Sequence, residues 1–441
     1  MKQNKRYLYF ICLIATMGGL MFGFDIAIIS GAVPFIQSYF SWNELQLGWG
    51  VSSLIVGAVI GAFGSGFLTD QYGRKKVLIF TSLSFAVSCA ATALAPSSVV
   101  FISARILGGL AVGAASVLSP MYVSEVAPPG KRGMLVSIYQ FTITFGILIS
   151  YLINFWLHDE PNNWRWMFAT GTIPSVLFFT GLFFIPESPR WLCKAGFREQ
   201  ALKVLTRIRG AAMAETELRE IEGSLSGSAS RVSFRDLLNP SSRKVIMVGF
   251  FLSVLVQISG IATVIDYAPK IFLAAGIEIK SALLQTSLIG LINGLFTFVA
   301  ILLIDKVGRR IFYIVGSAGM AVSLAVLAIS FYFHLSSIIT LACILAFIMF
   351  FASCIGPVFW TLVAEMFPNK IRGTAVAFAS FTQWATQFLV VLFFPHFLTK
   401  LGGASTFLFL GIMSAIQGAF AYFFIPETKG KTLEEIEHLW K

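Results

Sequence analysis

Apolar stretches long enough to cross a lipid bilayer recur along most of this chain, and they constrain its fold more than any other feature. Each stretch has roughly 20 residues, the length that a helix needs to span the hydrocarbon core, and is bounded by polar or charged residues. Because 57% of the residues are hydrophobic and only 12% are charged, a water-soluble globule could not bury so much apolar surface. We therefore predict an all-α membrane protein, with the lipid bilayer as its surroundings and twelve transmembrane helices. These spans are expected near residues 7–31, 46–68, 77–95, 99–121, 134–157, 165–185, 245–273, 281–304, 311–333, 338–364, 373–398 and 404–425.

The basic residues predict how these helices are oriented. If successive loops alternate between the two sides of the membrane, all but five of the 32 Lys and Arg residues fall on one side. The positive-inside rule makes that side cytoplasmic, so both termini are expected in the cytoplasm and the chain in the cytoplasmic (inner) membrane. The net charge of +11 is then explained by topology, and we expect no nucleic-acid partner. The five exceptions are Arg105, inside a span, and Arg165, Lys270, Lys280 and Lys400.

Chemistry-bearing motifs are missing from the sequence. It contains no nucleotide-binding loop and no nucleophile placed for catalysis, and its His residues are scattered. The five cysteines lie in spans or on the predicted cytoplasmic side, where disulfides are rare. We therefore expect no enzyme activity, no cofactor and no metal site. The amino-terminal stretch "MKQNKRYLYFICLIATMGG" resembles a signal peptide, but eleven spans follow it, so we interpret it as a retained first helix.

Three motif pairs repeat along the chain at nearly one spacing. "SEVAPPGKRG" (124–133) matches "AEMFPNKIRG" (364–373), "PESPR" (186–190) matches "PETKG" (426–430), and "DQYGRKK" (70–76) matches "DKVGRR" (305–310). Such duplication is typical of transporters whose two halves move past each other around a substrate site. We predict two homologous six-helix halves, at residues 1–185 and 245–441. The polar segment 186–244 between them is expected to form short cytoplasmic helices, and a short cytoplasmic tail ends the chain.

The motifs resemble those of the sugar porter family of the major facilitator superfamily, and most of all its bacterial xylose–proton symporters. The strings that carry the resemblance are "GFDIAIISG", "GRKK", "RILGGLAVGAASVLSPMYVSEVAPPGKRG", "PESPRWL", "DKVGRR", "GPVFWTLVAEMFPNKIRG" and "PETKGKTLEEIE". They follow in order over nearly the whole chain. The resemblance implies the twelve-helix major facilitator fold and a monomer. It also implies proton-coupled symport of a pentose, a hexose or a related polyol by alternating access.

Asp25 and Arg105 are charged residues within the first and fourth predicted spans. Counted from the predicted outer helix ends, Asp25 and Arg105 are both roughly 10 to 14 Å deep, at about 1.5 Å per residue. They can pair if their helices face each other, and a carboxylate whose arginine partner is drawn away can take up a proton. The resemblance agrees, because the proton-coupled members of the family carry an aspartate and an arginine at these positions. The alternative is a purely structural ion pair in an uncoupled sugar facilitator or exchanger.

A second set of charges lies at the predicted cytoplasmic helix ends, at matched positions in both halves. Acids beside arginines there favour salt bridges that hold the cytoplasmic face closed and break when it opens, and the resemblance implies the same role. The alternative is a set of solvated loop charges with little energetic weight. The predicted latch consists of Asp70, Arg74, Glu125, Arg132, Glu187, Arg190, Asp305, Arg309, Glu365, Arg372 and Glu427.

A sugar site needs amides that bind hydroxyls and an aromatic floor for the apolar face of the ring. The spans offer both, and the resemblance implies that these residues line the sugar or its cavity. The alternative for any one amide is a hydrogen bond across a helix interface. The predicted substrate-binding residues are Phe24, Gln140, Gln257, Asn293, Trp360, Gln383 and Trp384.

The seventh span departs from the pattern that the resemblance implies. It reads "VQISGIATVIDYAP", with Val256, Ala262 and Asp266 where the family has glutamine, asparagine and tyrosine. We expect Asp266 and Tyr267 to belong to the substrate site or its gate. Asp266 could bind a cationic or hydroxyl-rich substrate, titrate, or lie in a hydrated vestibule where Lys270 offsets its charge. Lost amides change which hydroxyls are recognised, so pentose, hexose, inositol and amino sugar all stay open.

Overall fold

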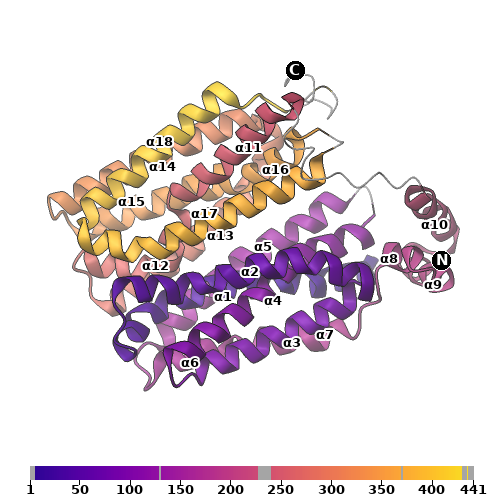
Figure 1. The fold of residues 1–441 in the computed structure, drawn as a ribbon, viewed down its shortest axis with the longest axis horizontal. Helices are drawn as coiled ribbons and strands as arrows, with labels where there is room; N and C mark the ends of the chain where they lie inside the picture. The colour runs from indigo at the N-terminus through magenta and orange to yellow at the C-terminus, as the bar shows by residue number, and fades with distance from the viewer. Residues whose placement is uncertain (1–4, 129–130, 227–239, 369–370, 430–434, 436–441) are drawn as a thin grey trace. The chain divides into compact units, whose positions relative to one another are not determined.

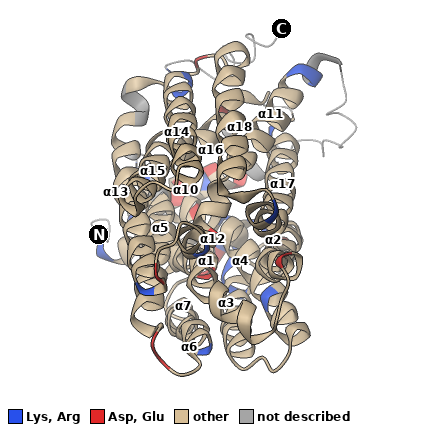
Figure 2. Cartoon of the chain, turned by 90° about the vertical axis from the view of Figure 1, so that its left-hand side faces the viewer, with Lys and Arg blue, Asp and Glu red and all other residues tan. Residues whose placement is uncertain are grey.

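Long apolar helices make up most of the chain in the computed structural model, which describes residues 5–128, 131–226, 240–368, 371–429 and 435. Within these residues there is no strand, as predicted for an all-α protein (Figure 1). Eleven helical stretches there are long and apolar enough to cross a membrane. Figure 2 shows how little of the chain is charged.

The helices pack as two compact units, which we call the first unit and the second unit. The first unit comprises residues 1–25, 53–147 and 165–230, and the second unit comprises residues 26–52, 148–164 and 231–441. This grouping follows packing, whereas the predicted halves 1–185 and 245–441 follow sequence similarity, so the halves stay a prediction.

Four helices are divided between the units. The first unit contains the amino-terminal parts of α1 (Lys5–Tyr39) and α5 (Arg132–Leu157) and the carboxyl-terminal parts of α2 (Glu44–Tyr72) and α6 (Asn163–Thr170). It also contains the whole of α3 (Arg74–Ala93), α4 (Ser98–Val126), α7 (Thr172–Leu182), α8 (Pro189–Lys194), α9 (Arg198–Arg209) and α10 (Ala211–Ser226). The second unit contains the rest of α1, α2, α5 and α6, together with α11 (Pro240–Ile258), α12 (Ile261–Ala274), α13 (Ile279–Val307), α14 (Arg309–Tyr332), α15 (Ser337–Phe350), the π-helical turn η3 (Phe351–Ile355), α16 (Gly356–Met366), α17 (Arg372–Lys400) and α18 (Gly402–Phe424).

Glycines let α2 and α4 of the first unit touch backbone to backbone. A Cβ atom built on Gly109 would lie 2.0 Å from the carbonyl oxygen of Leu54, and one on Gly113 would lie 2.0 Å from that of Ala58. Small residues at such crossings are how membrane helices gain close van der Waals packing. These contacts fix α4, the helix that carries Arg105.

The predicted sixth span is divided in the structure. α6 and α7 meet at Gly171, and neither helix alone is long enough to cross a bilayer. The eleven long apolar stretches found among the described residues correspond to the other eleven predicted spans. A Cβ on Gly171 would lie 2.7 Å from Sγ of Cys89 and 3.1 Å from Cε1 of Phe24. The glycine therefore allows the α6–α7 junction to approach α1 and α3.

The predicted seventh span is also divided. α11 ends at Ile258 and α12 begins at Ile261. Between them Gly260 has φ +91°, a left-handed conformation that favours glycine. Further along, Pro269 has no N–H to donate to the carbonyl of Ile265. That carbonyl instead accepts a hydrogen bond from the Tyr151 hydroxyl at 2.9 Å.

The segment that follows α7 forms short helices, as predicted for residues 186–244. α8, α9 and α10 lie side by side in the first unit (Figure 1). They enclose a small apolar core of their own. That core consists of Leu192, Ala201, Leu205, Ala214 and Leu218.

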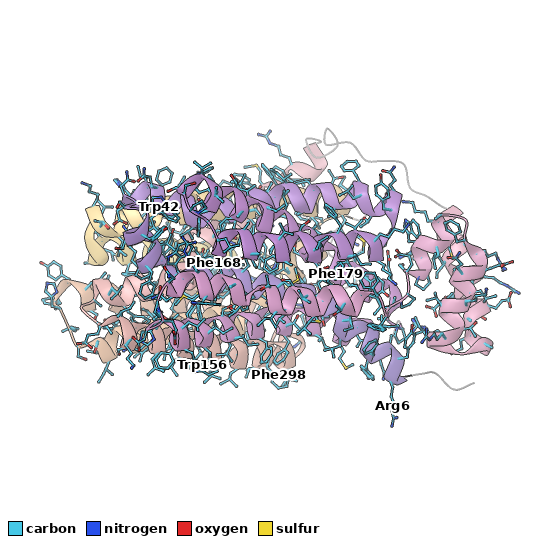
Figure 3. All side chains as sticks on the ribbon, turned by 90° about the horizontal axis from the view of Figure 1, so that it is seen from below. Arg6, Trp42, Trp156, Phe168, Phe179 and Phe298 are labelled. Atoms are coloured by element: carbon cyan, nitrogen blue, oxygen red, sulfur yellow. The ribbon has the colours of Figure 1, made fainter. Side chains whose placement is uncertain are left out.

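Large apolar side chains are exposed on the long helices. Trp156 is 68% exposed and Phe298 is 54% exposed, and both lie at the margin of the second unit in Figure 3. Exposed apolar side chains along helices of this length are characteristic of a bundle that spans a membrane.

Candidate functional site

Asp25 and Arg105, predicted within the first and fourth spans, lie against each other in the first unit. Arg105 Nη1 on α4 is 2.5 Å from Asp25 Oδ1 on α1. Asp25 is 3% exposed and Arg105 is 2% exposed. Among the described residues, Asp25 Oδ2 and the Nε and Nη2 atoms of Arg105 have no hydrogen-bond partner. Burying an ion pair with unused donors and acceptors is costly, which favours a role in function over one in stability.

A glycine on α4 lets the Ser88 hydroxyl of α3 pack closely beside the ion pair. A Cβ on Gly108, one turn from Ala104, would lie 3.8 Å from Asp25 Oδ2 and 2.5 Å from Ser88 Oγ. The Ser88 hydroxyl donates to the carbonyl of Ala104 at 2.7 Å, which joins α3 to α4. The pair is thus held by helices that are themselves closely packed.

A charged network lies at the start of α3. Arg74 donates to Glu125 through Nη2 at 2.8 Å and through Nε at 3.0 Å. Glu187 accepts from the backbone N–H groups of Arg74 and Lys75, at 2.9 and 3.1 Å, and so caps the helix. Burial raises the pKa of the Glu187 carboxyl, against the opposing effect of these backbone hydrogen bonds. Ser188 Oγ completes the network by donating to Glu125.

The second unit repeats this network at the start of α14. Glu427 accepts from the backbone N–H groups of Arg309 and Arg310, at 3.0 and 3.1 Å. Arg309 Nη2 is 3.4 Å from Glu365 Oε1, and Thr428 Oγ1 donates to Glu365 Oε2 at 2.7 Å. The helix in each unit begins after a glycine with positive φ, so the two networks share both their chemistry and their backbone shape.

The remaining predicted latch residues differ in their surroundings. Asp70 lies 2.8 Å from Lys194 Nζ and 4.0 Å from Arg74. Arg372 donates to the carbonyl oxygen of Phe367 at 3.1 and 3.2 Å. Arg190 is exposed at the start of α8. The side chains of Arg132 and Asp305 lie outside the described residues.

Most of the predicted sugar-binding residues lie in the second unit. Gln257 is 5% exposed at the end of α11, and Asn293 is 7% exposed on α13. On α17, Gln383 and Trp384 are half-buried, whereas Trp360 on α16 is 44% exposed. The side-chain oxygens of Gln257 and Gln383 have no hydrogen-bond partner within the described part of the chain. They are therefore acceptors available to a hydroxyl group.

The first unit holds the other two predicted sugar-binding residues. Phe24 on α1 is 2% exposed and directly precedes Asp25. Gln140 on α5 is half-buried. One aromatic ring of the predicted site is thus next to the buried ion pair in sequence.

α12 carries both residues predicted for the gate. Tyr267 is fully buried, donates its hydroxyl proton to the carbonyl of Val391 at 3.0 Å and stacks on Phe394, so it joins α12 to α17. Asp266 is 5% exposed, which disfavours the hydrated vestibule. Lys270, which one of the three alternatives paired with Asp266, directs its ammonium group to Glu44 Oε2 at 2.6 Å.

Sequence reasoning missed the residues that surround Lys270. Gln37 Oε1 accepts from Lys270 Nζ at 3.0 Å, and Gln37 Nε2 donates to Glu44 Oε1 at 3.1 Å. The sequence offered one signal, because Glu44 is among the few acids predicted on the outer side. Its partner could not be inferred, since Glu44 and Lys270 are far apart in sequence and no motif links them.

Comparisons with known proteins agree with this architecture. Residues 11–440 match the family described as "Sugar (and other) transporter". The arabinose-proton symporter of Bacillus subtilis (strain 168) is 39% identical over 99% of this chain and 96% of its own length. The D-xylose-proton symporter of Escherichia coli (strain K12) is 37% identical over 100% of this chain and 97% of its own.

A solved structure also matches the fold. The inward open conformation of the xylose transporter XylE from E. coli superimposes with a TM-score of 0.89 at 36% identity, covering 98% of this chain and 100% of that one. The family and these relatives are transporters and not enzymes, which confirms the predicted class. The chain belongs to the sugar transporter family of the major facilitator superfamily.

Proposed function

We propose that this protein carries a monosaccharide, a pentose or hexose, across the membrane together with a proton. The observation that carries the proposal is the buried Asp25–Arg105 pair, at 2.5 Å in a helical bundle. The names of the relatives support it, since they are proton symporters for arabinose and D-xylose. Proton coupling needs a group whose charge changes with the transport cycle, and a carboxylate in this setting is suited to that task.

In the proposed cycle Asp25 takes up the proton. While Asp25 is ionised, the guanidinium of Arg105 stabilises the carboxylate. A proton delivered to Oδ2, the oxygen without a partner among the described residues, neutralises Asp25 and removes the attraction that holds Arg105. The change in the ion pair then lets α1 and α4 shift, which links the proton to the change of access.

We assign the sugar to the amides and aromatics of the predicted site. The unpartnered oxygens of Gln257 and Gln383 are acceptors for sugar hydroxyls. Asn293 and Gln140 offer both a donor and an acceptor. Trp384 and Trp360 offer aromatic surface on the second unit, and Phe24 offers it on the first.

The repeated networks at the starts of α3 and α14 are assigned to the latch. Each holds an arginine against a glutamate, Arg74 with Glu125 and Arg309 with Glu365. In this proposal they stabilise one access state and rearrange in the other. The same Arg–Glu pairing in both networks supports one shared role for them in the transport cycle.

The protein is placed in the cytoplasmic (inner) membrane as a monomer. Its basic loops predict that both termini are in the cytoplasm. The relatives belong to bacteria, which supports this membrane. The exposed apolar side chains of the long helices then contact lipid.

The experiment that tests the proposal is sugar accumulation in proteoliposomes under an imposed pH gradient. The wild type is expected to concentrate arabinose or xylose, and Asp25→Asn is expected to abolish accumulation while leaving sugar exchange. Asp159→Asn is the matched control, because the Asp159 side chain is 77% exposed. Uphill accumulation by Asp25→Asn would rule out this carboxylate as the proton carrier and favour an uncoupled facilitator.

A competition panel identifies the substrate. Arabinose, xylose, galactose, inositol and glucosamine are compared on the wild type and on Asp266→Asn. Asp266 is a buried carboxylate on α12, so a preference for the amino sugar that disappears in the variant would reveal a cationic substrate.

A further inference from the structure

The guanidinium of Arg105 has a second neighbour besides Asp25. Its Cζ atom lies 5.5 Å from the centroid of the Phe168 ring. Within the described residues, Nε and Nη2 of this guanidinium have no hydrogen-bond partner, although the whole side chain is 2% exposed. The Asp25 carboxylate and the face of the Phe168 ring therefore provide most of the attraction that offsets the cost of burying the Arg105 charge.

The ring of Phe168 is fixed in place. It is 1% exposed, and the edge of the Phe101 ring packs against it with centroids 5.6 Å apart at an interplanar angle of 85°. Phe168 lies one turn before Gly171, whose N–H donates to the Phe168 carbonyl at 3.0 Å. Because Gly171 lacks a Cβ, the backbone there can approach Cys89 and bring the end of α6 close to α3. Figure 3 labels the ring on its helix.

An arginine stays charged at every physiological pH. When Asp25 is protonated, Arg105 loses its counter-charge but remains a buried cation. Attraction to the negative face of an aromatic ring is then the remaining stabilisation in the described surroundings. The strength of that attraction sets how unfavourable the protonated state of Asp25 is.

We propose that Phe168 is a positioning residue for proton coupling, whose ring face holds the charged Arg105 while Asp25 is protonated. The inference rests on the proposed function and adds a residue to it. The pair itself consists of Asp25 on α1 and Arg105 on α4. In the described surroundings, the Cys89 thiol on α3 is the further titratable group that faces it. Phe168 itself is neutral, so its effect is on the balance between the protonation states of the pair.

The first test is the pH profile of sugar accumulation in proteoliposomes. Without the ring, the state with protonated Asp25 is less favourable, so Phe168→Leu is expected to move the midpoint about one pH unit toward lower pH. Phe168→Tyr keeps a ring and is expected to restore the wild-type midpoint. Phe178→Leu is the matched control, because Phe178 is also fully buried in this unit but is absent from the contacts around Arg105.

The second test is a double-mutant cycle on thermal unfolding in detergent, which needs no transport. Phe168→Leu is expected to lower Tm by about 2 °C more in the Asp25→Asn background than in the wild type. Phe178→Leu is expected to lower Tm equally in both backgrounds. If Phe168→Leu does not fold, Phe168→Met replaces it, since methionine fills a similar volume without a ring.

Each result decides between two explanations. Additive effects of Phe168→Leu and Asp25→Asn on Tm would overturn the proposal that the Phe168 ring holds Arg105. An unchanged pH midpoint in Phe168→Leu, with a coupled wild type, would overturn the role in proton coupling. A wild type that accumulates no sugar under a pH gradient would overturn the proposed function, and the cycle would still decide whether Phe168 holds Arg105.

Discussion

Lys270 Nζ lies 2.6 Å from Glu44 Oε2, so a salt bridge joins α12 to the first turn of α2. Both side chains are largely buried, and Gln37 contacts each of them. Because Lys270 follows Asp266 by one turn and Tyr267 by three residues, this salt bridge holds the segment predicted to act as a gate.

Removing this charge pair is expected to loosen α12. Lys270→Met should weaken the packing of α12 against α2 by about 1.5 to 3 kcal/mol, the usual contribution of a hydrogen bond to a charged group. A cysteine introduced at Ala268, which is fully buried on α12, should then react faster with a water-soluble maleimide. Lys280→Met is the control, because Lys280 and Asp159 are 3.9 Å apart and both are exposed. Equal labelling rates in the two variants would show that the Lys270–Glu44 contact does not hold α12.

The backbone contact of α2 with α4 predicts intolerance to side chains. Gly109→Val would place a Cβ only 2.0 Å from the carbonyl oxygen of Leu54. The two helices would then have to separate. We expect a loss of about 3 kcal/mol or failure to fold. Gly66→Ala is the control, since nothing lies within 4 Å of a Cβ there. Tm and the yield of monodisperse protein measure both variants, and a Tm for Gly109→Val equal to that of Gly66→Ala would contradict the close approach.

Glu187 predicts a dependence of stability on pH with a definite sign. Burial raises its pKa in the folded state above the ordinary value of 4.5, so the folded protein binds this proton more tightly than the unfolded chain. The stability that this proton contributes to the folded protein is fully present below the ordinary pKa. It is lost as pH rises through the raised pKa of the folded state.

The comparison that isolates this effect is the Tm of wild type and Glu187→Gln over a range of pH. The advantage of the wild type should be greatest near pH 4.5 and should decrease above it. Glu199→Gln, at an exposed residue of α9, corrects for effects of charge in general. An advantage that grows with pH would mean that backbone hydrogen bonds outweigh burial at Glu187.

Gln257 should affect sugar binding more than stability. Its amide oxygen has no partner in the described structure, so removing it costs no internal hydrogen bond of that atom. Gln257→Ala is expected to raise KM for the sugar by about 10-fold to 100-fold, the cost of one or two lost hydrogen bonds. Asn154→Ala, at a buried amide of α5 whose Nδ2 donates to the carbonyl of Ile28 at 3.3 Å, should lower Tm and leave KM unchanged. The reverse pattern would make Gln257 a structural amide.

Much of this architecture could be predicted from the sequence, because lipid imposes a simple rule on helix length and hydropathy. The rule did not report the break of the sixth span at Gly171, where the backbone fits against Cys89 in a tertiary contact. Equal depth made a pair of Asp25 and Arg105 possible, and the resemblance favoured it, but the pairing remained conditional on their helices facing each other. Repeated motifs likewise indicated the networks around Arg74 and Arg309.

Other contacts could not be predicted, because they join distant residues without a motif. The hydroxyl of Tyr151 satisfies the carbonyl freed by Pro269, and this depends on how α5 crosses α12. One alternative had Lys270 offset Asp266 because the two are one turn apart, but Glu44 supplies an acceptor at 2.6 Å. Local spacing could not show that competitor. The position of Phe168 over Arg105 depends in the same way on the packing of α6.

The most direct measurement of the proposed mechanism is the pH of the medium when sugar is added to de-energised, weakly buffered vesicles that contain the protein. Cotransport predicts that arabinose or xylose makes the medium outside more alkaline as protons enter with the sugar. Asp159→Asn should give the same signal, and Asp25→Asn should give none. Sugar entry without any change of external pH in the wild type would contradict proton coupling at Asp25.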